Sequence, residues 1–142
     1  MSDTVPGKTV ADVQAIVDRS AYLTWLGLRI ERVEPGVIDL TATWRPEWVA
    51  NPDIGQTQGG ILASVLDFAA NFSLIDHAGG PVPTVDLRID YHRLAKQGDL
   101  VVQGRAMKTG RQISWAEAVV YDQQGNLLAS GRGTFMTVQK PK

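Results

Sequence analysis

The sequence predicts an α+β fold in which an antiparallel sheet wraps around one long central helix. Residues 57–74, "TQGGILASVLDFAANFSL", have the pattern of an apolar helix that begins at two glycines. After Pro83, apolar and polar residues alternate in segments separated by turn sequences, which is typical of antiparallel strands. The 142 residues suit one domain, 1–142, in which residues 1–8 are expected to form a flexible tail.

The first part of the chain predicts a helix and a hairpin before the central helix. Residues 9–24 carry apolar side chains at helical spacing, and Thr9 with Asp12 has the pattern of a capping box. Residues 26–44 form two extended runs around a Glu-Pro-Gly turn, which indicates a β-hairpin. A loop at 45–56 then leads to the two glycines.

The central helix and the strands after it have clear ends. The sequence "HAGGP" at 77–81 places glycines and a proline where the helix should stop. Four strands are predicted, near 83–93, 99–108, 112–122 and 127–138. Small residues recur at alternate positions of the last two strands: Ala116, Ala118, Ala129, Gly131 and Gly133. Such positions would let a helix lie close against the sheet.

Composition limits the classes of function. The chain has 14 Lys and Arg against 15 Asp and Glu, so its formal net charge of -1 gives no basic field for nucleic acid or an anionic membrane. It contains no cysteine, and its two histidines lack metal-ligand spacing, so no metal site is expected. With no secretion signal and no apolar run of about 18 residues, a cytoplasmic protein that binds neither nucleic acid nor membrane is expected.

One carboxylate lies in the apolar helix. At about 100° per residue, one polar stripe holds Gly60, Ser64, Asp67 and Asn71. Apolar side chains cover the rest, so the helix is expected to be buried nearly all round. A buried carboxylate needs partners, because its desolvation alone costs several kcal/mol. Asp67 either bonds locally and fixes the packing, or acts as a general base or nucleophile while Asn71 orients water or the carboxylate. The helix pattern alone leaves both interpretations open.

Four features follow one another along the chain. A glycine pair starts the helix, an acid lies seven residues after the second glycine, a strand begins with Thr seventeen residues further on, and a basic loop ends in Gly-Asp. They occur in "NPDIGQTQGGILASVLDFAAN" and "PTVDLRIDYHRLAKQGDLVVQGRAMKTGRQISWAEAVVYDQQGNLLASGRGTF". In this order, over about residues 22–138, the chain resembles the hotdog-fold acyl-CoA thioesterases, in the branch typified by phenylacetyl-CoA thioesterase. The resemblance implies a hotdog fold, dimers that join their sheets edge to edge, and active sites between subunits.

The resemblance also implies roles by position. Asp67 matches the acid that activates water or attacks the thioester, and Gly59 matches the glycine whose N–H points at the thioester oxygen. Thr84 matches the hydroxyl residue that assists the acid or its water. Asn51 lies near the Asn or Gln beside the thioester, with one extra residue of spacing. Gln58 replaces the usual histidine before the glycines, but a glutamine amide still donates hydrogen bonds.

Helix geometry independently favours a site shared by two subunits. Gly59 and Asp67 are about 12 Å apart along a straight helix, so one carbonyl cannot easily contact both. Antiparallel helices across a two-fold axis would bring the two groups together twice, with N–H donors where oxyanion charge develops. The expected site combines two residues of one chain, Gly59 and Gln58, with three of the other, Asp67, Asn71 and Thr84. A homodimer, paired into a homotetramer, is expected.

Six residues are expected to contact the substrate: Gly60, Ser64, Trp48, Arg93, Lys96 and Arg111. The first two share the polar stripe of the helix. The three cations lie in loops at the ends of predicted strands, where they either form a solvated rim or hold the phosphates of coenzyme A. Trp48 precedes the helix and either lines an acyl or aryl pocket or packs in the core.

The resemblance predicts hydrolysis of an acyl- or aryl-CoA thioester to the free carboxylic acid and coenzyme A, with no metal or redox cofactor. Water attack assisted by Asp67 and transient acylation of Asp67 both fit the sequence. One alternative is a non-catalytic acyl-CoA binding or sensing protein, which the missing motif histidine favours. A second is a hotdog hydratase or dehydratase, whose acid needs a histidine partner that neither His77 nor His92 is placed to supply.

Overall fold

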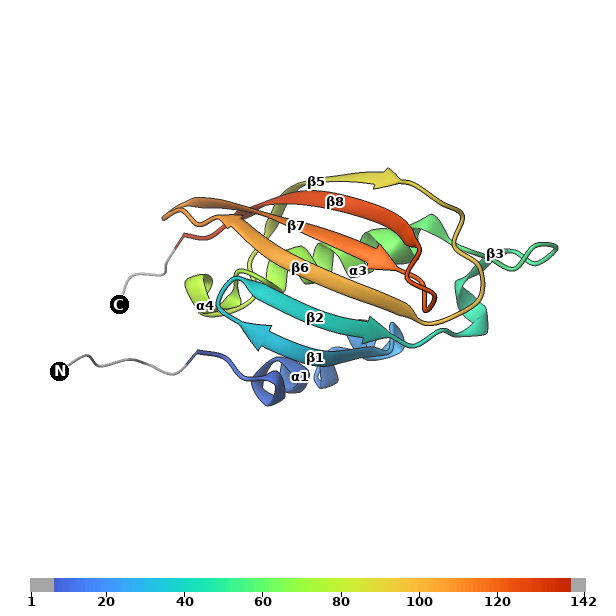
Figure 1. Ribbon diagram of the computed structural model, residues 1–142. Helices are drawn as coiled ribbons and strands as arrows, with labels where there is room; N and C mark the ends of the chain where they lie inside the picture. Colours follow the sequence, from blue (N-terminus) through green and yellow to red (C-terminus); the bar gives the residue numbers. More distant parts are fainter. Residues whose placement is uncertain (1–6, 139–142) are drawn as a thin grey trace.

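The computed structural model describes residues 7–138. A six-stranded antiparallel sheet, in the order β1-β2-β6-β7-β8-β5, curves over the helix α3, Gly59–Phe72 (Figure 1). Its strands are β1 (Leu28–Glu34), β2 (Val37–Ala42), β5 (Thr84–Tyr91), β6 (Leu100–Lys108), β7 (Ile113–Tyr121) and β8 (Leu127–Met136). The predicted α+β architecture, a sheet wrapped around a long helix, is confirmed. The predicted flexible tail falls mostly on residues 1–6, which lie outside the described residues.

The N-terminal helix is interrupted where one continuous helix is predicted. It consists of α1, Val10–Asp18, and α2, Ala21–Trp25. Ser20 separates them because its backbone is extended and its Oγ accepts the N–H of Leu23 at 3.1 Å, which caps α2. The predicted capping box of Thr9 at the start of α1 is confirmed.

The predicted loop between the hairpin and the central helix contains short regular structure. A 3-10 turn, η1 (Pro46–Trp48), precedes a two-stranded ribbon of β3 (Val49–Asn51) and β4 (Gln56–Thr57). Figure 1 shows this ribbon projecting beyond the end of the main sheet. Its base is fixed to the start of α3, because the Gln58 N–H donates to the Trp48 carbonyl at 2.7 Å.

The apolar faces of α3 pack against the inner face of the sheet. Eight of its residues are buried: Ile61, Leu62, Val65, Leu66, Phe68, Ala69, Ala70 and Phe72. The predicted small residues Ala116 and Ala118 are buried on the face of the sheet that packs against the helix. The sequence analysis missed a closer helix–sheet contact at Gly104. A Cβ on Gly104 would overlap the carbonyl oxygen of Ala69, so only glycine lets the backbones come this close.

The central helix ends earlier than predicted. After Phe72 the chain turns and forms a separate short helix, α4 (Ile75–Ala78). Gly79 ends α4 with a φ of 81°, a left-handed conformation that glycine adopts without strain. Within residues 7–138, none of the helices combines the length and apolar character needed to cross a membrane.

Candidate active site

Asp67 and Thr84 form a hydrogen-bonded pair under the edge strand of the sheet. The Thr84 hydroxyl donates to Asp67 Oδ1 at 2.8 Å. Asp67 is half-buried, like Ser64 and Asn71 on the same stripe, and Gly60 is exposed. The expectation that α3 is buried nearly all round therefore holds for its apolar faces and is wrong for its polar stripe within one protomer. A partly exposed carboxylate that is hydrogen-bonded to one hydroxyl group is suited to general-base or nucleophilic chemistry.

A β-bulge turns Thr84 toward the helix. Thr84 pairs with Phe135 and Asp86 pairs with Thr134, so Val85 is an extra residue without a counterpart on β8. Phe135 is fully buried on the helix side of the sheet, and Thr84 shares its face. Without the extra residue, the alternation along β5 would place Thr84 on the outer face with Asp86. The bulge thus creates the contact with Asp67.

The start of α3 presents backbone N–H groups to an open cleft. Gln58 is the N-cap, and its Oε1 accepts the Gly60 N–H at 3.3 Å. Within the described residues, the Gly59 N–H has no acceptor, as expected for the first residue of a helix. The cleft has a volume of about 550 Å³ and is lined by Gln56, Thr57, Gln58, Gly59, Gly60, Leu62, Tyr91, His92, Arg93, Leu94 and Ala95. Free N–H donors at a helix start suit an oxyanion or another negative group.

A single protomer does not bring the two halves of the predicted site together. Gln58, Gly59 and Gly60 line the cleft, whereas Asp67 and Thr84 do not. The two groups are separated by about 12 Å of straight helix. The structure therefore holds two partial sites along one helix face, each with only part of the chemistry that thioester hydrolysis needs.

Three other predicted residues make contacts within the protomer. Asn71 exchanges two hydrogen bonds with the Val82 backbone, at 2.6 and 3.1 Å, and so fixes the segment that leads into β5. Ser64 bonds through its Oγ to the Tyr22 hydroxyl at 2.6 Å. Asn51 lies in the exposed β3–β4 ribbon, where its side chain accepts the backbone N–H two residues on. It does not line the cleft.

Two of the three predicted phosphate-binding cations lie together near the start of α3. Arg93 lines the cleft and, with Lys96, a neighbouring hollow of about 230 Å³. Arg93 donates to Asn126 Oδ1 at 2.9 Å. A hydrogen bond from the Asn126 amide, helped by the Arg93 charge, lowers the pKa of the nearby Asp122 carboxyl from its ordinary value. Arg111 lies in the β6–β7 turn, at the opposite end of the strands.

Trp48 and the two histidines lie away from Asp67. Trp48 is fully buried in the hydrophobic core, so the structure supports its interpretation as a core residue and places its ring outside the cleft. His77 bonds through Nε2 to the Gly110 carbonyl at 2.7 Å. His92 bonds through Nε2 to the Ser130 hydroxyl at 2.8 Å. Neither histidine is a hydrogen-bond partner of Asp67 in the described part of the chain.

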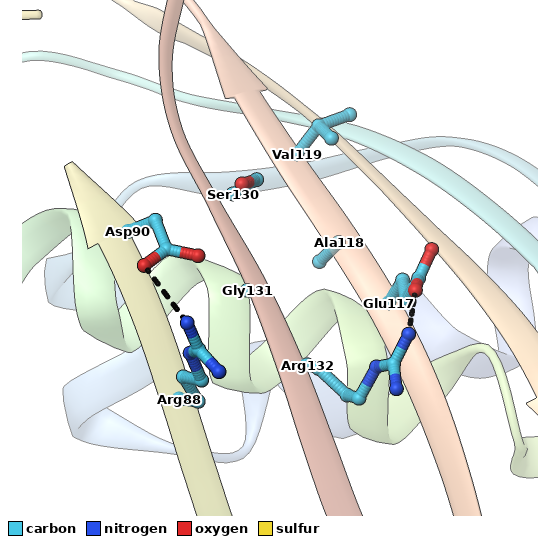
Figure 2. Close-up of a pocket in the computed structure, with 8 residues that line it drawn as sticks. All are labelled: Arg88, Asp90, Glu117, Ala118, Val119, Ser130, Gly131 and Arg132. Carbon is cyan, nitrogen blue, oxygen red and sulfur yellow. Dashed lines mark hydrogen bonds and ion pairs between the residues drawn. The ribbon is translucent and has the colours of Figure 1, made fainter. Parts of the chain in front are cut away.

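A second hollow, of about 390 Å³, lies on the outer face of the sheet. Figure 2 shows its charged side chains on β5, β7 and β8, with α3 behind the sheet. Arg132 pairs with Glu117 at 2.7 Å, and Arg88 lies 3.8 Å from Asp90. Both arginines are thus already paired with carboxylates, and the sheet separates them from Asp67. We therefore place the candidate active site on the helix side.

The sequence analysis missed Tyr91, which contacts the start of α3. Its hydroxyl donates to the Gly59 carbonyl at 2.8 Å. A signal was present in the sequence, since Tyr91 follows Leu87 and Ile89 at alternate positions and so lies on their face of β5. Sequence alone did not reveal that this face meets the first turn of the helix.

Comparison with known proteins identifies the family. Residues 55–129 match the model of the family described as the Thioesterase superfamily. The chain belongs to this superfamily. The matched residues include Gly59, Asp67 and Thr84, so the superfamily assignment covers both partial sites. The predicted hotdog fold and the predicted membership of the thioesterases are confirmed.

Two solved structures share the fold of this chain, and one curated relative matches most of its length. A solved superfamily protein is 40% identical, with a TM-score of 0.85, covering 89% of this chain and 96% of that one. The E. coli PaaI protein from the phenylacetic acid degradation operon is 22% identical, with a TM-score of 0.80 and coverage of 89% and 90%, and supports the fold alone. The medium/long-chain acyl-CoA thioesterase YigI of Salmonella typhimurium is 26% identical over 78% of this chain and 81% of its own.

Proposed function

We propose that this protein hydrolyses an acyl- or aryl-CoA thioester to the free carboxylic acid and coenzyme A. The main support for the proposal is the hydrogen bond between Thr84 and Asp67, on the partly exposed polar stripe of α3. Membership of the thioesterase superfamily supports thioester hydrolysis in general. The name of one relative, a medium/long-chain acyl-CoA thioesterase, supports a coenzyme A ester, and the aryl alternative comes from the sequence resemblance.

The proposed enzyme is a homodimer joined through β5. This strand is at the edge of the sheet, bonded to β8 on one side, and its outer backbone groups can pair with a second copy. Val85 and Tyr91 on it are 57% and 54% exposed. An antiparallel β5–β5 contact across a two-fold axis would extend the sheet and cover these side chains. Pairing of two such dimers into a tetramer stays a prediction.

Charge limits this contact to two registers. A two-fold axis through the sheet places one residue of β5 opposite its own copy and keeps each face of the strand on its own side. With Leu87 at the centre, Asp86 lies opposite the second copy's Arg88, twice. With Arg88 at the centre, two arginines face each other and Asp86 faces Asp90, which is unfavourable. With Ile89 at the centre, Arg88 faces Asp90, which charge alone also allows.

We propose the register centred on Leu87 for the shared site. Tyr91 lies beside Gly59, and Thr84 lies beside Asp67. Because Val85 is an extra residue, Ile89 is then opposite the Thr84–Val85 bulge of the second copy, and Tyr91 lies two residues further along the same face. Gly59 of one protomer then faces Asp67 of the other. Centring on Ile89 places Tyr91 opposite Leu87, also two residues along that face from the bulge, so the charge-exchange experiment on β5 decides between the two registers.

In the shared site, each group has one chemical task. The thioester carbonyl oxygen accepts the free Gly59 N–H, and the Gln58 amide supplies a second donor from its NH₂ group. Asp67 of the other protomer either takes a proton from the attacking water or attacks the carbonyl carbon itself, forming an anhydride that water then cleaves. Thr84 holds the Asp67 carboxylate in orientation. In both routes the C–S bond breaks, and the products are the acid and the coenzyme A thiol.

We also propose a position for coenzyme A in this arrangement. Arg93 and Lys96 are near the mouth of the cleft at the start of α3, so they are placed to hold phosphate groups outside while the thioester reaches Gly59. Arg111 at the far end of the strands is not required for this placement. No metal or redox cofactor is part of the proposed reaction.

Two other functions are weaker on structural grounds. A hydratase or dehydratase is disfavoured, because His77 and His92 bond to Gly110 and Ser130 rather than to Asp67. A non-catalytic acyl-CoA sensor is the remaining alternative, because Gln58 stands where the related motif has histidine.

A hydrolysis screen distinguishes the enzyme from the sensor. Purified protein is incubated with short, medium, long-chain and aryl coenzyme A esters, and the free thiol is measured. The proposal expects turnover of at least one ester and loss of that turnover in Asp67→Asn. Tight binding of an ester without turnover by wild type would instead select the sensor.

A further inference from the structure

We propose that Tyr91 is a positioning residue that orients the N–H donors at the start of α3. The inference rests on the proposed hydrolysis and adds a residue to its site. Two contacts carry it: the Tyr91 hydroxyl donates to the Gly59 carbonyl at 2.8 Å, and the Tyr91 ring lies where a side chain at position 59 would be.

The sheet directs Tyr91 to this place. Tyr91 pairs with Ala129 on β8, and Ala129 is fully buried on the helix side of the sheet. Residues paired directly across an antiparallel ladder share a face, so the Tyr91 side chain leaves β5 toward the helix. Its small neighbour leaves room for the ring to lean over the first turn of α3. The other side of the ring stays open to the cleft, since Tyr91 is 54% exposed.

The accepting carbonyl lies one peptide unit after the proposed oxyanion donor, the Gly59 N–H. The Gly59 carbonyl and the Gly60 N–H are the two ends of one amide group, and the Gly59 N–H is on the preceding amide. A hydrogen bond to a carbonyl polarises its amide and strengthens donation from the N–H at the other end. It also fixes the plane of that amide, and so restricts the rotation that sets the direction of the neighbouring Gly59 N–H. Tyr91 therefore acts on the oxyanion donors through the backbone.

Two adjacent glycines make such a restraint necessary. Glycine adopts more backbone conformations than any other residue, so a Gly-Gly helix start is flexible without outside contacts. Within residues 7–138, two side chains bond to this turn: Gln58 on the Gly60 N–H at 3.3 Å, and Tyr91 on the Gly59 carbonyl at 2.8 Å. The Tyr91 bond is shorter and comes from the rigid sheet, so it is the main restraint.

The ring also accounts for glycine at position 59. A Cβ at that position would lie 3.3 Å from Tyr91 Cε1, a tight contact, and 3.4 Å from Cζ and Oη. A side chain at position 59 would require the ring to shift by a few tenths of an ångström, which would disturb its hydrogen bond. Gly59 and Tyr91 thus depend on each other.

The test compares Tyr91→Phe with Tyr121→Phe, a tyrosine-to-phenylalanine control on β7 that lines a separate hollow with residues of β2 and β6. We expect Tyr91→Phe to lower kcat about fivefold with KM unchanged, as for loss of one hydrogen bond, and Tyr121→Phe to behave as wild type. Thermal unfolding of both variants checks that the fold is kept. Wild-type kcat in Tyr91→Phe, or a raised KM with unchanged kcat, would overturn the positioning role, because the latter indicates direct substrate binding.

A second measurement separates this inference from the proposed function. Hydrogen–deuterium exchange is followed in peptides that cover 58–63, in wild type and Tyr91→Phe. Faster exchange there in the variant alone supports the restraint even if wild type hydrolyses no ester, in which case the proposed function fails by itself. Equal exchange in both proteins would overturn the restraint, whether or not the protein is an active thioesterase.

Discussion

Thr84 reaches Asp67 with a 2.8 Å hydrogen bond from a strand whose regular alternation would point it the other way. The extra residue Val85 reverses its face. A bulge costs ladder hydrogen bonds at that point, and this one lies beside the only carboxylate on the helix stripe. The geometry of the proposed acid–hydroxyl pair therefore depends on one inserted residue.

Replacing the acid tests its role most directly. Asp67→Asn keeps the shape of the side chain and its hydrogen bond with Thr84, but it cannot take a proton or form the acyl intermediate. We expect kcat to fall by at least about 100-fold, the usual lower range for loss of a general base. The assay is thiol release from the best ester of the screen. Asp18→Asn, an exposed acid at the end of α1, is the control and should keep full activity.

The Thr84 hydroxyl is tested by two substitutions of similar size. Thr84→Val removes the donor to Asp67, and we expect kcat to fall about tenfold, since a hydrogen bond to a charged group is lost. Thr84→Ser keeps the hydroxyl and should retain most of the activity. Equal losses in the two variants would mean that packing of the Thr84 methyl group, and not the hydroxyl, supports the reaction.

The register of the dimer is tested by charge exchange on β5. Asp86→Arg would place like charges opposite each other twice in the register centred on Leu87. We expect the dissociation constant, from sedimentation across a dilution series, to rise about tenfold. Adding Arg88→Asp should restore it in this register. In the register centred on Ile89, the same double change would set two acids against each other and weaken the dimer.

A control for that experiment is available on the opposite edge of the sheet. Glu31→Arg on β1 makes the same change in charge at an exposed side chain far from β5. It should leave the dissociation constant unchanged. If it weakens the dimer as much as Asp86→Arg does, net charge rather than the β5 contact controls association.

The close packing of helix and sheet is tested at Gly104. Gly104→Ala forces a methyl group into the Ala69 carbonyl, and neither backbone can move freely, so we expect a loss of about 3 kcal/mol in the free energy of unfolding. Gly80→Ala is the matched control, because a Cβ at position 80 would have no heavy atom within 4 Å. Denaturant unfolding measures both, and the control should stay within about 0.5 kcal/mol of wild type.

Much of the fold was predictable because its signals are local. Alternation after Pro83 gave the four strands to within about two residues, an error typical of strand ends. The helix breaks at Ser20 and after Phe72 were missed, because apolar spacing continues across both and only the backbone conformation reveals the interruption.

The site was predictable as a set of residues but less so as an arrangement. The family resemblance related Thr84 to Asp67, and the structure shows their hydrogen bond, although the bulge that joins them leaves no mark in an alternating sequence. Tyr91 was missed because its role depends on a long-range contact. Trp48 looked like a pocket residue because it precedes the helix, yet long-range packing places it in the core.

The contact between Gly104 and Ala69 leaves the central helix almost no freedom to slide or rotate under the sheet. Gly59 and Asp67 lie on this helix, so the contact fixes the position of both relative to the sheet. Tyr22 on α2 and the β3–β4 ribbon lie outside this contact. Substitutions there leave the helix–sheet contact intact, whereas changes at the contact would disturb Gly59 and Asp67 at once.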